Sequence, residues 1–310
     1  MAKQAEDRGF EMDTLLQDIR FGLRTLLKHP RVMLLVVLSI GLGVGINTTV
    51  FSWMESVILN PYPTIENSEE LVALNTAETG DVSGGGARPI AYPTYKDLRN
   101  SSRSFQDLAV HASDRLNLRV DANTTGEAVW SQFVSSNYFT VLHVPAALGR
   151  TLLPEDEQQA APVAVISDSI WRTKFGADPS IVSKRVLLNG QPVTIVGVAP
   201  PRFNGSIVGL AFDLWTPVTM SPVLLPGKNN INSRGDRWMQ GLGRLKSDVS
   251  LEQARSEILT LSQQLSQNDG ESPVQGIVVQ RLRDQLAGRL LTPLFSVLLI
   301  ISGIVLLTAC

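Results

Sequence analysis

The sequence is poor in charge and nearly without cysteine. Asp, Glu, Lys and Arg make up only 18% of its 310 residues, against about 25% in a typical soluble domain. The single cysteine, Cys310, excludes an internal disulfide and a cysteine-based zinc site. The three histidines match no H-E-x-x-H pattern and are expected at the surface or at interfaces: His29, His111 and His143. The net charge is −2, so the chain has no excess of Lys and Arg to attract phosphate groups, and we expect no nucleic-acid partner.

The missing charge is concentrated in two runs. Residues 32–54 and 290–310 contain no Asp, Glu, Lys or Arg. About 20 apolar residues are enough to cross a bilayer as a helix. We therefore predict a first transmembrane helix at 32–54 and a second, incomplete one at 290–310. A cleaved signal peptide is the alternative for the first run, but its apolar core would be shorter and followed by an A-x-A site.

The basic residues predict an orientation. Four of them lie in the twelve residues before the first run: Arg20, Arg24, Lys28 and Arg31. Cytoplasmic flanks carry the excess of Lys and Arg, so the N-terminus is expected in the cytoplasm and residues 55–289 on the other side of the membrane. Three arginines oppose this assignment, although long translocated domains follow the rule poorly: Arg281, Arg283 and Arg289. Residues 1–31 show amphipathic helical spacing and are expected to lie at the cytoplasmic membrane surface, or to extend the span.

Two glycines in the first run form the only candidate site. Gly41 and Gly45 have the small-x-x-x-small spacing that lets two transmembrane helices approach closely. We predict that they pack against another transmembrane helix. The alternative is that both glycines are incidental in a helix that faces lipid.

Residues 55–289 are long enough for a domain of their own. Its two ends repeat a strand–helix–strand pattern, with strands at 71–76, 105–112, 238–245 and 276–282 and helices at 92–100 and 250–265. Ser250 and Gln253 fit a capping box for the last helix. Two such units around a strand-rich insertion at about 115–235 predict one α+β domain made from both ends of the segment.

Local signals also organise the insertion. Asn189-Gly190 lies between apolar runs in residues 186–199 and predicts a β-hairpin. Residues 169–175 are expected to form a short helix that ends before Gly176. Residues 129–149 lack charge but carry many polar side chains, so we expect a strand and a short helix there rather than a membrane span.

No catalytic pattern is present. The sequence has no G-x-S-x-G motif, and the glycines at 84–86 are not followed by Lys-Ser/Thr, so they are no phosphate loop. The acidic run at 155–157 is expected to be a solvated turn rather than a metal site. The tryptophans are expected in the core rather than on a binding platform: Trp130, Trp171, Trp215 and Trp238. We therefore expect no enzyme, no catalytic residue, no metal and no bound cofactor.

Several stretches carry a family resemblance. They include DIRFGLRTLLKHP (18–30), LSIGLGVGINTTVFS (38–52), YPTYKDLRNSSRSFQDLA (92–109), VSSNYFTVLHVPAALGRTLLPEDE (134–157) and GRLKSDVSLEQARSEI (243–258). In their order and spacing, the chain resembles the N-terminal part of MacB-type, FtsX-like ABC transporter permeases, and more narrowly the duplicated orphan permease branch. The resemblance implies an α+β membrane protein of the bacterial inner membrane. Transmembrane helices would flank a periplasmic core domain at 55–289, made of a discontinuous porter-like part and a mainly β insertion.

The resemblance also implies a function and partners. A separate cytoplasmic ABC ATPase would hydrolyse ATP, and the permease would transmit that movement to its periplasmic domain and drive efflux. Further implied partners are a periplasmic adaptor, an outer-membrane channel, membrane lipid and a second copy of the permease in a homodimer. Since the sequence stops within the second predicted span, we expect a fragment of a longer permease.

Two other functions stay open at this point. One is an FtsX-like component that releases lipoproteins or regulates cell-wall hydrolases. The other is a membrane-anchored periplasmic scaffold or sensor that takes no part in transport.

Overall fold

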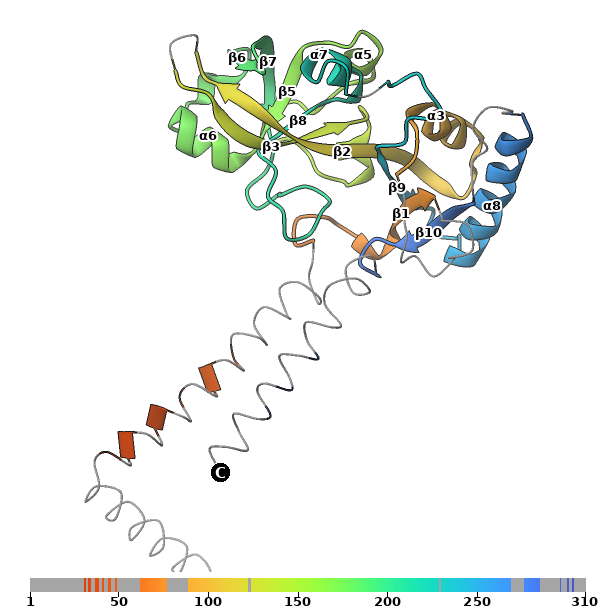
Figure 1. Cartoon of the computed structure of the whole chain (residues 1–310), viewed down its shortest axis with the longest axis horizontal. Coiled ribbons are helices and arrows are strands. Elements are labelled where there is room, and N and C mark those ends of the chain that lie inside the picture. The colour runs from red at the N-terminus through yellow and green to blue at the C-terminus, as the bar shows by residue number, and fades with distance from the viewer. Residues whose placement is uncertain are drawn as a thin grey trace, which may run out of the picture. The chain divides into compact units, whose positions relative to one another are not determined.

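The computed structural model describes residues 62–76, 89–121, 124–228, 230–268 and 276–284, with twelve isolated positions between 31 and 48 and between 296 and 303. Contacts within the chain divide it into two units. One unit comprises Met1–Ser56 and Thr292–Cys310, and the other is Val57–Leu291. The elements of the second unit are labelled in Figure 1.

In the first unit, the isolated described residues are helical. Within the described part of the chain, no helix has both the length and the apolar character needed to cross a bilayer. Residues 1–30 and most of the two predicted spans lie outside the described residues, so those segments stay predictions. Gly41 and Gly45 are described, and a Cβ built on either one meets no heavy atom within 4 Å. Their packing against another helix also stays a prediction.

The second unit begins and ends with a split β-α-β arrangement. Its four strands are β1 (Leu71–Thr76), β2 (Phe105–Arg119), β9 (Gln240–Leu245) and β10 (Ile277–Arg281). Their order in the sheet is β10-β1-β9-β2, and each neighbouring pair is antiparallel. Strand β1 is therefore parallel to β2 with β9 between them, and β9 is parallel to β10 with β1 between them. We call these strands and their two helices the split β-α-β part.

Two helices cover one face of this sheet. They are α3 (Tyr92–Ser101), between β1 and β2, and α8 (Leu251–Asn268), between β9 and β10. Val72 and Leu74 of β1 join the core cluster beneath the helices, whereas Leu71 and Ala73 join a second cluster on the opposite face. The predicted strands and helices at both ends of the domain are thus confirmed, with shifts of a few residues at their bounds and a longer β2.

The predicted capping box at the start of α8 is also confirmed. The backbone N–H of Gln253 donates to Ser250 Oγ at 3.2 Å, and the backbone N–H of Ser250 donates to Gln253 Oε1 at 2.8 Å. These reciprocal bonds satisfy backbone donors that have no partner inside the helix.

The insertion forms a closed ring of strands. It contributes β3 (Glu127–Val134), β4 (Leu148–Gly149), β5 (Val163–Ile166), β6 (Arg185–Leu188), β7 (Gln191–Val198) and β8 (Leu214–Pro217). The pairings run β2-β3-β8-β5-β7-β6 and return to β2. The pairs β3–β8 and β5–β7 are parallel, and the other four are antiparallel. We call this arrangement the strand ring. Closure leaves a packed interior, as in small barrels.

Short helices lie in the connections that follow the strands of the insertion. They are α4 (Tyr138–Val141), α5 (Pro154–Gln158), α6 (Asp168–Phe175) and α7 (Ser221–Leu224), with 3₁₀ turns η3 (Pro179–Ile181) and η4 (Val218–Met220). A further 3₁₀ turn, η2 (Ser68–Glu70), precedes β1. Helix α6 ends at Gly176, whose φ of 60° is the usual left-handed stop. The turn between β6 and β7 has φ of 47° at Asn189 and 82° at Gly190, as expected for a two-residue hairpin. The predicted short helices and the hairpin are confirmed.

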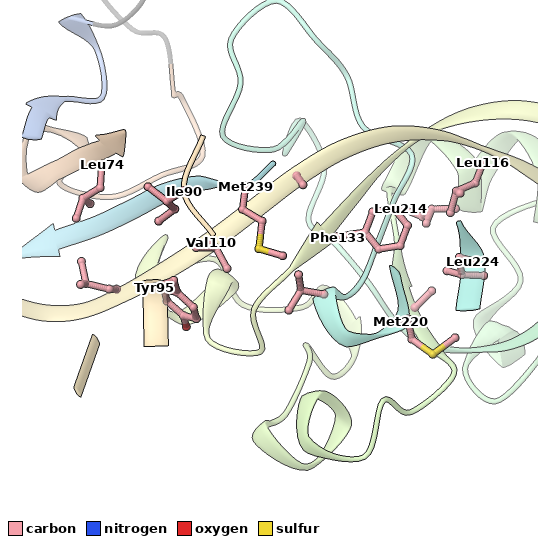
Figure 2. Close-up of a cluster of buried hydrophobic side chains, with 14 of the residues drawn as sticks. Leu74, Ile90, Tyr95, Val110, Leu116, Phe133, Leu214, Met220, Leu224 and Met239 are labelled. Atoms are coloured by element: carbon pink, nitrogen blue, oxygen red, sulfur yellow. The ribbon is translucent and has the colours of Figure 1, made fainter. Parts of the chain in front are cut away.

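Strand β2 belongs to both parts of the domain. Its first half pairs with β9, its second half pairs with β3, and His111 is paired with a residue of each strand. The hydrophobic core is shared in the same way. Leu74, Ile90 and Tyr95 from the split β-α-β part and Leu116, Phe133 and Leu214 from the strand ring belong to one cluster, with Val110 and Met239 between them (Figure 2). The two parts therefore fold as one body around this shared cluster.

Two expectations about polar residues are wrong. The acidic run at 155–157 is not a solvated turn, because Asp156 and Glu157 lie in α5 and are only 6% and 7% exposed. His111 is not at the surface, since it is 3% exposed inside the domain. His143 is exposed, and His29 and the glycines at 84–86 lie outside the described residues.

The tryptophans are placed as expected. Trp215 is fully buried. The other three pack against the two core clusters with part of their surface exposed: Trp130, Trp171 and Trp238.

A candidate coupling junction

A buried arginine connects the beginning of the domain with the strand ring. Arg244 lies in β9 and is 1% exposed. Its Nε donates to the carbonyl oxygen of Val141, the last residue of α4, at 2.7 Å. Its two terminal nitrogens donate to the carbonyl oxygens of Asn67 (3.1 Å) and Glu66 (3.0 Å) and to Glu70 Oε2 (3.1 Å).

These four acceptors explain how the guanidinium can be buried. A charged group loses its hydration in the interior and needs a full set of partners in return. The carbonyl groups at the end of α4 and in residues 66–70 supply most of that set, and Glu70 supplies the countercharge. Residues 62–70, which we call the lead-in segment, are thereby tied to β9 and to α4 through one side chain.

A second polar cluster joins α3 to the strand ring. Arg99 of α3 and Asp107 of β2 form a bidentate ion pair, with N–O distances of 2.8 and 2.9 Å. Asn137, just before α4, donates from Nδ2 to Asp107 Oδ2 at 2.7 Å and to the carbonyl oxygen of Leu108 at 2.6 Å. Its Oδ1 accepts from the hydroxyl of Tyr95 at 3.3 Å. Hydrogen bonding to Asp107 raises the pKa of Arg99, so the guanidinium stays charged.

Glu157 of α5 also joins α3 to the residues that precede α4. Its Oε2 accepts from the backbone N–H and the hydroxyl of Ser136, at 2.6 and 2.5 Å. Its Oε1 accepts from the hydroxyl of Tyr92 in α3 at 2.6 Å, and its carbonyl oxygen accepts from the hydroxyl of Thr219 at 2.7 Å. Burial, and then the charge of Glu157, raise the pKa of Tyr92, so its hydroxyl stays a donor.

A line of buried hydrogen bonds runs from the lead-in segment into the strand ring. The hydroxyl of Tyr62 donates to the carbonyl oxygen of Ser206 at 3.2 Å, and the backbone N–H of Ser206 donates to the hydroxyl of Tyr138 at 3.0 Å. The hydroxyl of Tyr138 in turn donates to Gln132 Oε1 at 3.0 Å. Both tyrosines are buried, and burial raises the pKa of each.

The line ends at His111. Trp215 Nε1 also donates to Gln132 Oε1, at 2.8 Å, and Gln132 Nε2 lies 3.3 Å from His111 Nδ1. Since the amide nitrogen of Gln132 can only donate, His111 Nδ1 is assigned as the acceptor. Burial lowers the pKa of His111 to about 4, so the imidazole is neutral at pH 7.

A cleft opens beside Glu157. Its volume is about 460 Å³, and it is lined by α3, α5 and the loop that follows α7. Tyr92, Tyr95 and Glu157 are among its lining residues. Among the residues that the structure describes, no group of three or more His, Cys, Asp and Glu side chains is placed to hold a metal ion.

Sequence reasoning did not identify these residues. The predicted pair, Gly41 and Gly45, lies in the other unit. One local signal for Arg244 was present, because a charged residue stands between Leu242 and Leu245 in an apolar strand. No local signal marks Glu157 or Gln132, most of whose partners lie 21 to 83 residues away along the chain.

Comparisons with known proteins agree with this fold. The family model described as "MacB-like periplasmic core domain" matches residues 33–261. The macrolide export ATP-binding/permease protein MacB of Hahella chejuensis is 27% identical over 250 residues, which are 77% of this chain and 35% of that protein. The probable syringafactin export ATP-binding/permease protein SyfD of Pseudomonas syringae is 28% identical over 126 residues, 41% of this chain and 18% of that protein. This chain thus spans about a third or less of the length of these relatives.

Among solved structures, the periplasmic region of MacB from Actinobacillus actinomycetemcomitans is similar in fold. The TM-score is 0.53 at 18% sequence identity, and the match covers 73% of this chain and 96% of that chain. At this identity the likeness concerns the fold alone.

Proposed function

Because the chain belongs to the MacB-like periplasmic core domain family, we propose that it is the permease part of an ABC-type export system. The resemblance to MacB-type permeases is confirmed at the level of the family. Its narrower assignment to the duplicated orphan permease branch stays a prediction. In this proposal the domain lies in the periplasm, and the chain is held in the inner membrane with its N-terminus in the cytoplasm.

The permease itself is proposed to be non-catalytic. The relatives are named ATP-binding/permease proteins, and the match to this chain covers the periplasmic core domain and only 35% of the first of them. A separate cytoplasmic ATPase would hydrolyse ATP, and the permease would carry the resulting movement to the periplasmic side. The purified chain alone is expected to turn over no ATP, and clear turnover would contradict this part of the proposal.

The observation that carries the proposal is the Arg244 junction. The lead-in segment follows the first predicted span in sequence, so it is the first part of the domain that a movement of that span would reach. Arg244 binds Glu66, Asn67 and Glu70 of this segment and Val141 of α4 in the insertion at once. A pull on the lead-in segment would therefore move both parts of the domain together.

The names of the relatives favour export over the alternatives. Both relatives described above are named export proteins. No described feature favours lipoprotein release, control of cell-wall hydrolases, or a scaffold without transport. An adaptor, an outer-membrane channel and a homodimer remain proposed partners, as does packing through Gly41 and Gly45.

The proposal can be tested by gene deletion. We expect the host without the gene to accumulate at least one compound of a panel that includes a macrolide and a lipopeptide, because these classes appear in the names of the relatives. The wild-type gene should restore export, whereas Arg244→Met should not, even when its level in the membrane is normal.

Two results would contradict export. One is unchanged accumulation of every compound in the panel. The other is mislocalised lipoproteins or altered hydrolase activity in the deletion strain, either of which would favour an FtsX-like role.

A further inference from the structure

The cleft beside Glu157 has the size and lining of a small-molecule site. Its volume of about 460 Å³ lies within the usual range of ligand pockets, roughly 300–1,000 Å³. Tyr92 and Tyr95 supply an aromatic wall, and Pro154 and Ile231 add apolar surface. It also lies where α3 of the split β-α-β part meets α5 of the insertion, and boundaries of this kind are common places for binding sites.

The buried end of the cleft carries a carboxylate, Glu157, that has no direct ion-pair partner among the described residues. Of the neighbouring charges, Arg99 is bound to Asp107 and Asp156 to Arg150, and Lys96 lies over the Tyr92 ring. A buried carboxylate without a direct ion-pair partner favours the approach of a cation.

One oxygen of Glu157 can accept a further hydrogen bond. Oε2 has two donors, the backbone N–H and the hydroxyl of Ser136. Oε1 has one donor, the hydroxyl of Tyr92. A carboxylate oxygen can accept two hydrogen bonds, so Oε1 can take another donor while the contacts to Ser136 stay in place.

The aromatic wall already accepts an ammonium group from the chain itself. Lys96 Nζ lies 5.7 Å from the centre of the Tyr92 ring, within the range of a cation–π contact. The rings of Tyr92 and Tyr95 are 5.8 Å apart. Lys96 is exposed, so its ammonium can return to water at little cost.

We propose that this cleft binds an organic cation, a primary ammonium group on a short apolar chain. The ammonium would donate to Glu157 Oε1 and lie over Tyr92 in place of Lys96, and the apolar chain would contact Ile231. The proposal goes beyond the export function and does not depend on it, because binding is measured without an ATPase or transport. The competing explanation is that Glu157 serves only to hold Ser136 and α3.

The test uses three probes of similar size and different charge: n-butylammonium, 1-butanol and butyrate. The full chain is purified in detergent with ¹³C-labelled isoleucine methyl groups, and the Ile231 signal is assigned with Ile231→Val. We expect saturable shifts of this signal with butylammonium at a Kd at least about tenfold lower than that for 1-butanol, which is a modest electrostatic preference. Butyrate should produce no saturable shift.

Other outcomes would overturn the proposal. Equal binding of butylammonium and 1-butanol would mean that the cleft binds the butyl chain and makes no use of the ammonium charge. Tighter binding of butyrate would mean that Lys96 and Arg99 dominate the site.

Variants separate binding from structure. Glu157→Gln keeps the shape and removes the charge, so butylammonium should bind no better than 1-butanol. Lys96→Met is the matched control, because it removes the internal competitor and should tighten butylammonium binding by about threefold. Should Glu157→Gln fail to fold, Tyr92→Phe replaces it: this change keeps the ring and frees Oε1, and it must retain the preference for butylammonium. Loss of the preference in Tyr92→Phe, or its survival in a folded Glu157→Gln, would overturn the proposal.

Discussion

Arg244 Nε donates to the carbonyl oxygen of Val141 at 2.7 Å, across 103 residues of sequence. The bond joins a strand of the split β-α-β part to a helix of the insertion. The same guanidinium holds the lead-in segment. One side chain therefore connects the lead-in segment, where the chain enters the domain, with the insertion.

Replacing Arg244 should destabilise the domain strongly. Arg244→Met removes the donor for four acceptors and leaves Glu70 without its partner. Breaking a buried, fully hydrogen-bonded charge usually costs about 3–5 kcal/mol. Denaturant unfolding of the full chain in detergent would measure this loss. The control is Arg172→Met, which breaks an exposed ion pair with Asp168 and should leave the unfolding midpoint unchanged. An equal effect of the two changes would contradict the role of Arg244.

Tyr92 and Glu157 should be energetically coupled. Their 2.6 Å hydrogen bond ends on a carboxylate that is largely buried, and bonds to charged groups contribute about 1.5–3 kcal/mol. A double-mutant cycle with Tyr92→Phe and Glu157→Gln should show a coupling free energy of about 1–2 kcal/mol, because the amide nitrogen of the glutamine can still donate a weaker bond to the Tyr92 hydroxyl. Additive effects of the two changes would show that this contact does not join α3 to α5.

His111 should make the domain sensitive to acid. Its pKa is lowered to about 4 by burial, whereas in the unfolded chain it is about 6.5. Between these values the unfolded state binds more protons, so stability is highest above pH 6.5 and falls as the pH drops toward 4. This single group accounts for a loss of about 3 kcal/mol between pH 7 and pH 4.

The variant His111→Gln isolates this effect. It has no titrating group at the position, so its stability should fall less than that of the wild type over the same pH range. Unfolding midpoints of both proteins at pH 7, 6, 5 and 4 provide the comparison. Parallel pH profiles would contradict a neutral, buried His111.

Two glycines should respond differently to alanine. Gly190 has φ of 82° in the β6–β7 turn, a conformation that costs a residue with a side chain about 1 kcal/mol or more. Gly276, just before β10, has no positive φ, and the nearest atom to a built Cβ is 4.0 Å away. Gly190→Ala should lower the melting temperature, and Gly276→Ala should leave it unchanged or raise it. A reversed order would contradict the turn conformation.

The split β-α-β part was predictable because its signals are local. The apolar face of α8, its cap at Ser250 and the strands around it can each be read from short windows. The β6–β7 hairpin was predictable for the same reason, since Asn189-Gly190 determines the turn between adjacent strands.

The strand ring and the polar junction depend on contacts between distant residues. Closure of the ring rests on pairings such as Leu118 with Leu188, and nothing near either residue in sequence indicates the other. The burial of Glu157 follows from donors in α3 and before α4, and that of His111 from Gln132 in β3. Sequence reasoning treated these side chains as exposed because polar residues usually are. The partners that allow their burial are brought close only by the fold.

The central claim is that the split β-α-β part and the strand ring move as one body held by Arg244. Two spin labels would report the distance between the two parts, measured by pulsed electron paramagnetic resonance. They are attached at Thr173→Cys in α6 and Gln263→Cys in α8, with Cys310 replaced by serine. The account predicts one narrow distance in the wild-type background, unchanged when the cognate ATPase hydrolyses ATP, and a broadened distribution in Arg244→Met. A second distance or a shift in the wild-type background during ATP hydrolysis would contradict it.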